Sequence, residues 1–354
     1  MRLVAALAVI ATVLAGAGPS PSGSELQRAA DELIATSDIP AVITLVEHDG
    51  QRTVVASGEA EIGGRAARPD DTFWVGSITK SFIATVVMQL VAEHKLRLDD
   101  RVSKLLPGRF REGRRIRLRN LLNHTSGIWN YMELEPWASA VARNPRVVIS
   151  PRRLVTSAAR LPLQFRPGSR ASYSNTNYLV LAEILHRVTG RSVGTLLRER
   201  IFEPLGLTAT RYEGGRRDLR VEELHGYNVT LTPPQDVSQY GLGGPWADGA
   251  IVSNAHDLAG FFGALLRGQL VPPDLLAQMQ KIVPISHGEG MGLYRLPTPC
   301  GGWLYGHTGG TPGYVTFAAG SRDGRDFYVV DWNGVSQTAI QAMDRYIDEL
   351  ICYG

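Results

Sequence analysis

The chain has 354 residues, of which 44% are hydrophobic and 20% are charged, and its formal net charge is +3. This is the composition of a globular protein, and the length predicts one large domain or two smaller ones. The small net charge argues against a nucleic-acid partner, because the one basic run, residues 109–119, is diluted by acidic neighbours and is typical of a solvated face.

The N-terminus predicts export. Arg2 precedes an apolar run from Leu3 to Leu14, and Ala15-Gly16-Ala17 has the small-x-small pattern of a cleavage site. We interpret residues 1–17 as a secretory signal peptide and residues 18–23 as a disordered leader, since the run is short for a membrane span. No cysteine follows the run and no second long apolar segment ends the chain, so we expect a secreted monomer without a stable membrane anchor.

The mature chain is expected to begin with a helix and a β-hairpin. Ser24-x-x-Gln27 matches a capping box, which predicts a helix over residues 24–36. Residues 41–47 are rich in Val, Ile and Leu, and Asp49-Gly50 is a two-residue turn signal before a second strand at 53–58.

The next element is an almost entirely apolar helix that opens within residues 73–81 and runs to about His94. Its lack of a polar face predicts a buried central helix. Ser77 and Lys80 are three residues apart in its first turn and therefore share one face. The helix start also directs free N–H groups and the positive end of the dipole at this place, which suits a serine nucleophile that passes through an oxyanion.

The remaining chain is mostly helical from about residue 99 to 270 and then returns to strands at 314–319 and 327–332, before a closing helix at 336–351. We therefore predict an α+β fold with an antiparallel sheet built from the N- and C-terminal segments, residues 24–95 and 270–354, flanked by helices, with the helix of Ser77 at its edge. Residues 96–269 would form a mostly helical inserted domain, and the site would lie in the cleft between the layers.

Cys300 and Cys352 are the two cysteines of the chain. In an exported protein they most simply form one disulfide, and the alternative is two free structural thiols. Neither has a histidine or a second cysteine at metal-ligand spacing, and the other histidines lack clustered carboxylates. We therefore expect no metal and no cofactor.

Ser-x-x-Lys alone is a weak signal, because a capping serine and a surface lysine match it by chance. Here the neighbours of Lys80 are nearly all apolar, and burying a lysine is costly. A desolvated lysine binds its proton less tightly, so Lys80 could accept the proton of Ser77 near neutral pH.

Two further motifs could complete a site with Ser77. In Tyr173-Ser174-Asn175 the tyrosine hydroxyl can relay a proton and the asparagine amide can bind a substrate carbonyl, although for this motif alone a helix-entry turn with a packed aromatic is the favoured interpretation. In His307-Thr308-Gly309-Gly310, after a predicted strand at 303–305, two side chains could bind a substrate carboxylate and the glycines allow close approach of a substrate; the alternative is a glycine-rich turn.

The three motifs, in this order, resemble the signature of the serine penicillin-recognising enzymes, with His307 in place of the usual lysine. More narrowly, they resemble the branch that contains class C β-lactamases and soluble D-alanyl-D-alanine carboxypeptidases. Intervening segments match as well, and they are residues 121–127, Pro167-Gly168, residues 201–207 and residues 290–293. The resemblance covers the mature chain and implies a β-lactamase/DD-peptidase-like fold.

The resemblance also implies roles for individual residues. Ser77 would be the acylated nucleophile, and Lys80 and Tyr173 would move protons, with the acylation base left open between them. Asn175 would hold the substrate amide, and His307 with Thr308 would bind a terminal carboxylate. The backbone N–H groups of Ser77 and Gly310 would form the oxyanion hole. Trp246 would be an aromatic wall of the cleft or a packing residue, and Arg295 would contact the substrate carboxylate.

These roles predict a serine-type D-Ala-D-Ala carboxypeptidase that acts on peptidoglycan stem peptides and is acylated by penicillin. Its partners would be a small peptide substrate or a β-lactam. The alternatives are a class C-like β-lactamase and an esterase or D-amino-acid amidase of the same fold. A penicillin sensor without turnover is disfavoured, because it needs no proton shuttle. His124, in a His-Thr-Ser-Gly turn, is interpreted as structural.

Overall fold

The computed structural model describes residues 21–352, apart from 216–218, 242–243, 245 and 287. The predicted signal peptide and residues 18–20 of the predicted leader lie outside the described residues. In the part of the chain that is described, no helix has the length and apolarity needed to span a membrane.

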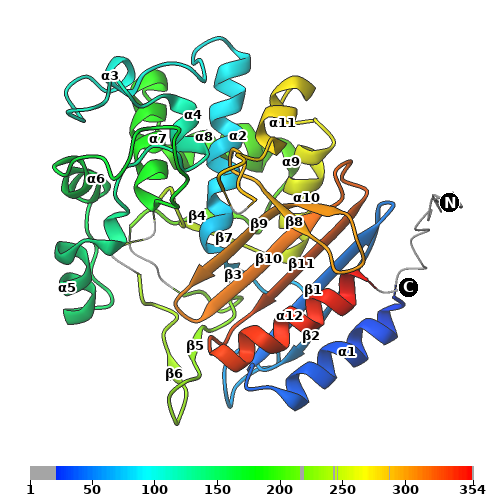
Figure 1. The fold of residues 1–354 in the computed structure, drawn as a ribbon. Coiled ribbons are helices and arrows are strands. Elements are labelled where there is room, and N and C mark those ends of the chain that lie inside the picture. Colours follow the sequence, from blue (N-terminus) through cyan, green and yellow to red (C-terminus); the bar gives the residue numbers. More distant parts are fainter. Residues whose placement is uncertain (1–20, 216–218, 242–243, 245, 287, 353–354) are drawn as a thin grey trace, which may run out of the picture.

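A six-stranded antiparallel sheet joins the two ends of the chain (Figure 1). Its order is β2-β1-β11-β10-β9-β8. The strands are β1 (Ala41–His48), β2 (Gln51–Gly58), β8 (Tyr294–Pro297), β9 (Trp303–Thr311), β10 (Tyr314–Gly320) and β11 (Asp326–Trp332). Because β1 pairs with β11 from opposite ends of the sequence, the predicted α+β architecture is confirmed.

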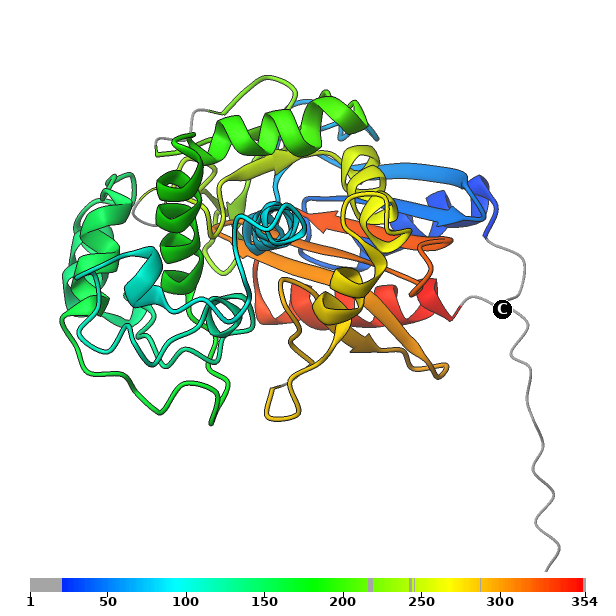
Figure 2. The ribbon, with the colours of Figure 1, turned by 90° about the horizontal axis from the view of Figure 1, so that it is seen from above.

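Helices cover both faces of this sheet (Figures 1 and 2). On one face lie α1 (Gly23–Thr36) and α12 (Gln337–Ile351), whose apolar residues share a buried cluster with Val42 and Trp332 of the strands. On the other face Phe262 of α10 (Ala255–Leu266) stacks on Phe327 with ring centroids 5.4 Å apart. This position of α10 against the sheet was not predicted, because residues 96–269 were assigned to the inserted domain. The division of the chain into a sheet domain and an inserted helical domain otherwise stays a prediction.

The N-cap of the first helix lies two residues before the predicted one. Ser22, not Ser24, caps α1, since the Glu25 N–H donates to Ser22 Oγ at 3.3 Å and the Ser22 N–H donates to the Glu25 carboxylate at 2.9 Å. The acidic side chain three residues after Ser22 completes the reciprocal pair. Residues 22 and 23 of the predicted leader are therefore part of the helix start.

The buried central helix is α2 (Thr79–Ala92), as the apolar pattern predicted. It stacks Phe82 on Phe261 of α10 at 3.6 Å between ring centroids. The remaining helices are α3 (Val102–Leu105), α4 (Leu118–Leu122), α5 (Glu135–Arg143), α6 (Pro151–Ala159), α7 (Asn175–Thr189), α8 (Val193–Leu197), α9 (Glu203–Leu205) and α11 (Pro273–Gln280).

Two small sheets were not predicted, because their strands are two or three residues long and carry no alternating pattern. One has the order β3-β7-β4 and the other pairs β5 with β6. Their strands are β3 (Phe73–Trp74), β4 (Arg211–Tyr212), β5 (Tyr227–Asn228), β6 (Gln235–Asp236) and β7 (Ile251–Ser253). The β3–β7 pair fixes the chain immediately before Ser77.

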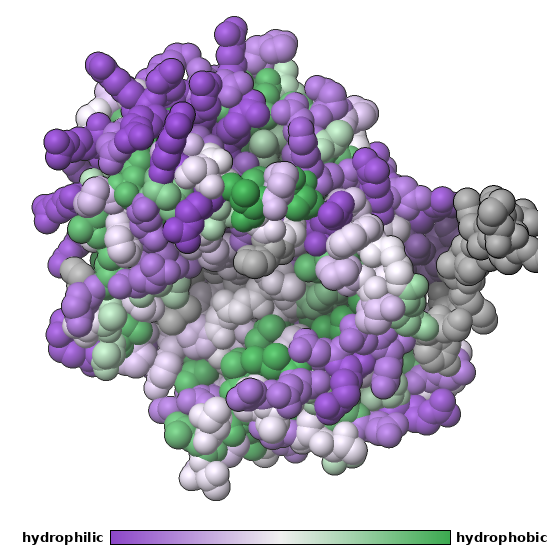
Figure 3. All heavy atoms as spheres, in the orientation of Figure 1, coloured by the Kyte–Doolittle hydropathy of each residue, from purple (hydrophilic) through white to green (hydrophobic). Residues whose placement is uncertain are grey.

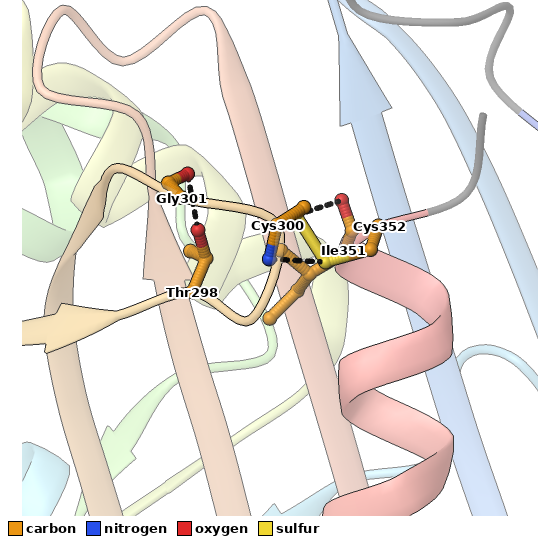
Figure 4. The surroundings of a disulfide bond; sticks show 5 residues. All are labelled: Thr298, Cys300, Gly301, Ile351 and Cys352. Atoms are coloured by element: carbon orange, nitrogen blue, oxygen red, sulfur yellow. Dashed lines mark hydrogen bonds between the residues drawn. A yellow bond between two sulfur atoms is a disulfide. The ribbon is translucent and has the colours of Figure 1, made fainter.

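The predicted disulfide is present between Cys300 and Cys352, whose Cα atoms are 5.6 Å apart (Figure 4). It joins the end of α12 to the loop between β8 and β9, and the Cys300 N–H also donates to Cys352 Sγ at 3.1 Å. Closing a segment of 52 residues stabilises the fold by about 4 kcal/mol in the chain-entropy model.

Candidate active site

Ser77 lies in a short turn between β3 and α2. Residues Gly76–Ile78 form a 3₁₀ turn and the α-helix begins at Thr79, so the serine precedes the helix that it was predicted to open. Gly76 has a left-handed φ of 53°, and a Cβ there would lie 2.9 Å from the carbonyl oxygen of Gly310. Glycine is required at this position both for its φ and for the close approach of β9.

Ser77 Oγ accepts two hydrogen bonds, one from the buried Lys80 and one from the half-buried Tyr173. Lys80 Nζ donates at 2.9 Å and the Tyr173 hydroxyl donates at 2.8 Å. Lys80 has 0% exposed surface, and this burial lowers the pKa of its ammonium to about 7. Burial raises the pKa of the Tyr173 hydroxyl, so it stays protonated at neutral pH. Two proton-transfer groups with separated pKa values therefore meet at one nucleophile.

Asp248 and Tyr131 complete the surroundings of Lys80, and sequence reasoning missed both. Lys80 Nζ donates to the backbone oxygen of Asp248 at 2.6 Å, and the Tyr131 hydroxyl donates to Asp248 Oδ2 at 2.8 Å. A charged residue in the otherwise small and apolar stretch 246–252 is a signal that could have pointed to Asp248. Tyr131 had no comparable signal.

His124 packs against the ring of Tyr173. Its ring stacks on the Tyr173 ring with centroids 4.3 Å apart, and its Nδ1 accepts the Ser174 N–H at 3.1 Å. Burial lowers the pKa of His124 well below its ordinary value, so the imidazole is neutral. This arrangement agrees with a structural role, in which His124 orients the tyrosine.

Asn175 begins α7 and faces the same pocket. Its Nδ2 donates to Met132 Sδ at 2.9 Å, and its backbone N–H donates to Asn130 Oδ1 at 3.3 Å. Both partners come from the segment after α4, so these hydrogen bonds join the start of α7 to that segment.

The strand that carries the third motif is longer than predicted. β9 continues to Thr311, so His307 to Gly310 lie within the strand and not in a turn after it. β8 pairs only with residues 303–306, so no strand of the described chain pairs with residues 307–311 on that side. A Cβ at Gly309 would lie 2.0 Å from the Val75 carbonyl oxygen, whereas one at Gly310 would have no atom within 4 Å. The strand therefore packs its backbone on the turn of Ser77 at Gly309.

His307 is buried and neutral. Burial, with the nearby Lys80, lowers the pKa of His307 to about 3. Its Nδ1 donates to the Thr308 carbonyl oxygen at 2.5 Å, and its ring meets Tyr294 edge-on at 4.7 Å between centroids. A neutral imidazole can bind a carboxylate only as a hydrogen-bond donor, and here its proton is engaged by the backbone.

A narrow pocket of about 60 Å³ opens beside Ser77. Its described lining includes Asn175, Trp246 and Gly310 of the predicted site, but not His307 or Thr308. Trp246 is held by a hydrogen bond from Nε1 to the Ile149 carbonyl oxygen at 2.9 Å. Figure 3 shows a hollow near the centre of this face, where Figure 1 places the N-terminal end of α2 and β9.

Arg295 lies on β8 and does not line this pocket. Its guanidinium stacks on the Trp303 ring, 4.1 Å from the centroid. Contact of Arg295 with a substrate carboxylate therefore stays a prediction. Among the described residues, no group of three or more His, Cys, Asp or Glu side chains could hold a metal ion.

Comparison with known proteins adds three findings. A model of the family described as Beta-lactamase matches residues 26–350. Penicillin-binding protein 4 of Amycolatopsis lactamdurans is 35% identical over 182 residues, which are 50% of this chain and 46% of that protein. D-aminopeptidase of Brucella anthropi is 34% identical over 154 residues, which are 43% of this chain and 28% of that protein.

Among solved structures, a D-stereospecific amidohydrolase from Streptomyces sp. has a TM-score of 0.84 and 33% identity, covering 94% of this chain and 100% of that chain. The chain spans between 46% and 67% of the length of three penicillin-binding relatives. The similarity to the amidohydrolase, in contrast, extends over the whole of that chain.

Proposed function

The chain belongs to the β-lactamase family and is a serine hydrolase of that family, and we propose that it is a secreted enzyme that cleaves amide bonds at the carbonyl of a D-amino acid residue through an acyl-enzyme on Ser77. The observation that carries this proposal is the pair of hydrogen bonds from Lys80 and Tyr173 to Ser77 Oγ. We also propose that the enzyme acts as a monomer.

Acylation follows from the protonation states of these groups. Lys80, with a pKa of about 7, takes the proton of Ser77 as Oγ attacks the substrate carbonyl carbon. The C–N bond breaks, the Tyr173 hydroxyl gives its proton to the leaving nitrogen, and the proton held by Lys80 restores the tyrosine. In deacylation a water attacks the ester, the bond to Oγ breaks, and Ser77 regains a proton while the acid is released.

The tetrahedral intermediate of each step carries a negative oxygen. We assign its stabilisation to the backbone N–H groups of Ser77 and Gly310, because the Ser77 turn and β9 approach each other closely at Gly76 and Gly309. In this assignment Gly76 and Gly309 allow the close approach that brings both N–H donors to one side of the pocket.

Two substrates share the proposed chemistry. A D-alanyl-D-alanine stem peptide, the predicted substrate, has a D-residue on the acyl side, and the similarity to a penicillin-binding protein supports it. A D-amino-acid amide also has a D-residue on the acyl side. The whole-chain similarity to a D-stereospecific amidohydrolase at 33% identity favours this second candidate.

The test compares substrates on one purified protein. Diacetyl-Lys-D-Ala-D-Ala, D-alaninamide, a chromogenic cephalosporin and p-nitrophenyl acetate are offered to the wild type, to Ser77→Ala and to the exposed control Ser24→Ala. We expect release of D-alanine or ammonia by the wild type and the control, and none by Ser77→Ala. Fast turnover of the cephalosporin alone would indicate a β-lactamase, and cleavage of the ester alone would indicate an esterase.

A further inference from the structure

The catalytic pocket contains an acidic side chain that the acyl-transfer mechanism does not use. Asp248 is the one Asp, Glu, Lys or Arg residue among the described residues that line the pocket, and it is 7% exposed. Two residues predicted to bind a substrate carboxylate, Arg295 and His307, do not line it, and Arg295 stacks on Trp303 instead. The pocket of Ser77 therefore presents a carboxyl group to the substrate.

The surroundings of this carboxylate leave its charge poorly compensated. Its side chain accepts a hydrogen bond from the Tyr131 hydroxyl, at 2.8 Å to Oδ2. Burial raises the pKa of Tyr131 well above its ordinary value, so this partner donates a hydrogen bond but supplies no charge. Lys80 is the nearby cation, but it must be neutral to act as a base, and it bonds the backbone oxygen of Asp248. Burial raises the pKa of the Asp248 carboxyl, so a cation that enters with the substrate would stabilise its ionised form.

Thr311 also lines this pocket. Its Oγ1 is buried and has no hydrogen-bond partner within the described part of the chain. A hydroxyl oxygen accepts hydrogen bonds from an ammonium group, which has three to donate.

The position relative to Ser77 fits one particular cation. Lys80 Nζ bonds both Ser77 Oγ and the Asp248 backbone oxygen, so the acidic residue lies next to the reacting centre. In an aminoacyl substrate the α-nitrogen is one carbon away from the carbonyl that Ser77 attacks. At pH 7 this amine is mostly protonated, because the ordinary pKa of an α-amino group is about 7.7–8.0.

We infer that Asp248 binds the free α-ammonium group of the D-aminoacyl substrate. The inference rests on the proposed function and narrows it: the enzyme would act on D-amino-acid amides and on peptides with a free N-terminal D-residue. Substrates whose α-nitrogen is acylated, including the stem peptides of a carboxypeptidase, would be poorer, because an amide N–H is neutral and leaves the Asp248 charge unpaired.

The experiment compares D-alanine p-nitroanilide with its N-acetyl derivative, using the wild type, Asp248→Asn and the control Asp344→Asn. Asp344 undergoes the same chemical change at an exposed position of α12, on the far side of the sheet. Asparagine keeps an oxygen for Tyr131, and thermal unfolding checks that the variant folds. The rate of Ser77 acylation by p-nitrophenyl acetate, which has no amine, reports on the nucleophile itself.

We expect the wild type and Asp344→Asn to prefer the free amine by roughly 10- to 100-fold in kcat/KM, the range of one charge-assisted bond. Asp248→Asn should lose this preference. Because Asp248 also raises the pKa of Lys80, the preference is taken as the ratio of the two anilide rates within each protein, and the ester rate measures any change in the nucleophile. Tyr131→Phe, which keeps the carboxylate, should retain the preference, and it is the second variant if Asp248→Asn does not fold.

Three results would overturn the inference. A wild type that cleaves both anilides equally or prefers the N-acetyl form has no ammonium site, although the proposed function then stands. An Asp248→Asn enzyme that slows on both anilides and on the ester by the same factor would make Asp248 a partner of Lys80 only. A wild type that cleaves neither anilide while the ester acylates Ser77 would refute the proposed function itself.

Discussion

Alanine at Gly309 should disable the enzyme, whereas alanine at the adjacent Gly310 should not. A Cβ at Gly309 would lie 2.0 Å from the Val75 carbonyl oxygen and 3.4 Å from the Ser77 nitrogen. The strand and the Ser77 turn must then separate by about 1 Å to reach normal contact. A Cβ at Gly310 would meet nothing within 4 Å, because it points into open space.

The expected magnitudes follow from these distances. Overpacking at Gly309 costs about 1–3 kcal/mol of stability, and a displacement of about 1 Å between the two oxyanion donors lowers the acylation rate by about 100-fold. Gly310→Ala should change stability by less than about 0.5 kcal/mol and acylation by less than about 3-fold. The burst of p-nitrophenolate from p-nitrophenyl acetate measures acylation, and thermal unfolding measures stability. Equal losses in both variants, or wild-type behaviour of Gly309→Ala, would refute the reasoning.

Three further predictions concern protonation, support of the tyrosine and the disulfide. The acylation rate should rise with pH through about 7, because Lys80 must lose its proton to act as a base. Asp248→Asn should move this inflection to lower pH, because the Asp248 carboxylate raises the pKa of Lys80. A rate that is flat from pH 5.5 to 8.5 would contradict the role of Lys80. His124→Phe should cost about 1–3 kcal/mol of stability, because it leaves the Ser174 N–H unpaired. The pH inflection of the acylation rate should stay unchanged, since the His124 imidazole is neutral. A shifted inflection would show that His124 titrates in the mechanism. The double variant Cys300→Ser, Cys352→Ser should lose about 4 kcal/mol in denaturant unfolding but keep its activity at 25 °C, and an unchanged unfolding midpoint would contradict the stabilising role of the disulfide.

Local signals predicted most of the fold. The apolar pattern of α2 and the Asp49-Gly50 turn each depend on neighbours in the sequence, and the structure has both. The extension of β9 through Gly309 was missed, because two glycines in a row indicate a turn in isolation. Only the turn of Ser77, packed on the strand from more than 200 residues away in the chain, explains why glycine is needed there.

The site was predictable where the motifs are local and unpredictable where they depend on distant pairing. Ser77 and Lys80 are three residues apart, so helical geometry brings them together, and Tyr173 was found through a resemblance. Asp248 meets Lys80 across 168 residues, and no pattern within a window predicts such a contact. The expected roles of His307 and Arg295 depended on where their side chains point, which the sequence does not specify.

The central claim is that Ser77 becomes acylated with Lys80 as the base. Intact-mass spectrometry and peptide mapping after incubation with benzylpenicillin and with p-nitrophenyl acetate test it most directly. We predict a single acyl group on the peptide that contains Ser77 in the wild type, none in Ser77→Ala, and a rate reduced by about 100-fold or more in Lys80→Met. An adduct on another residue, or undiminished acylation of Ser77→Ala, would contradict the account.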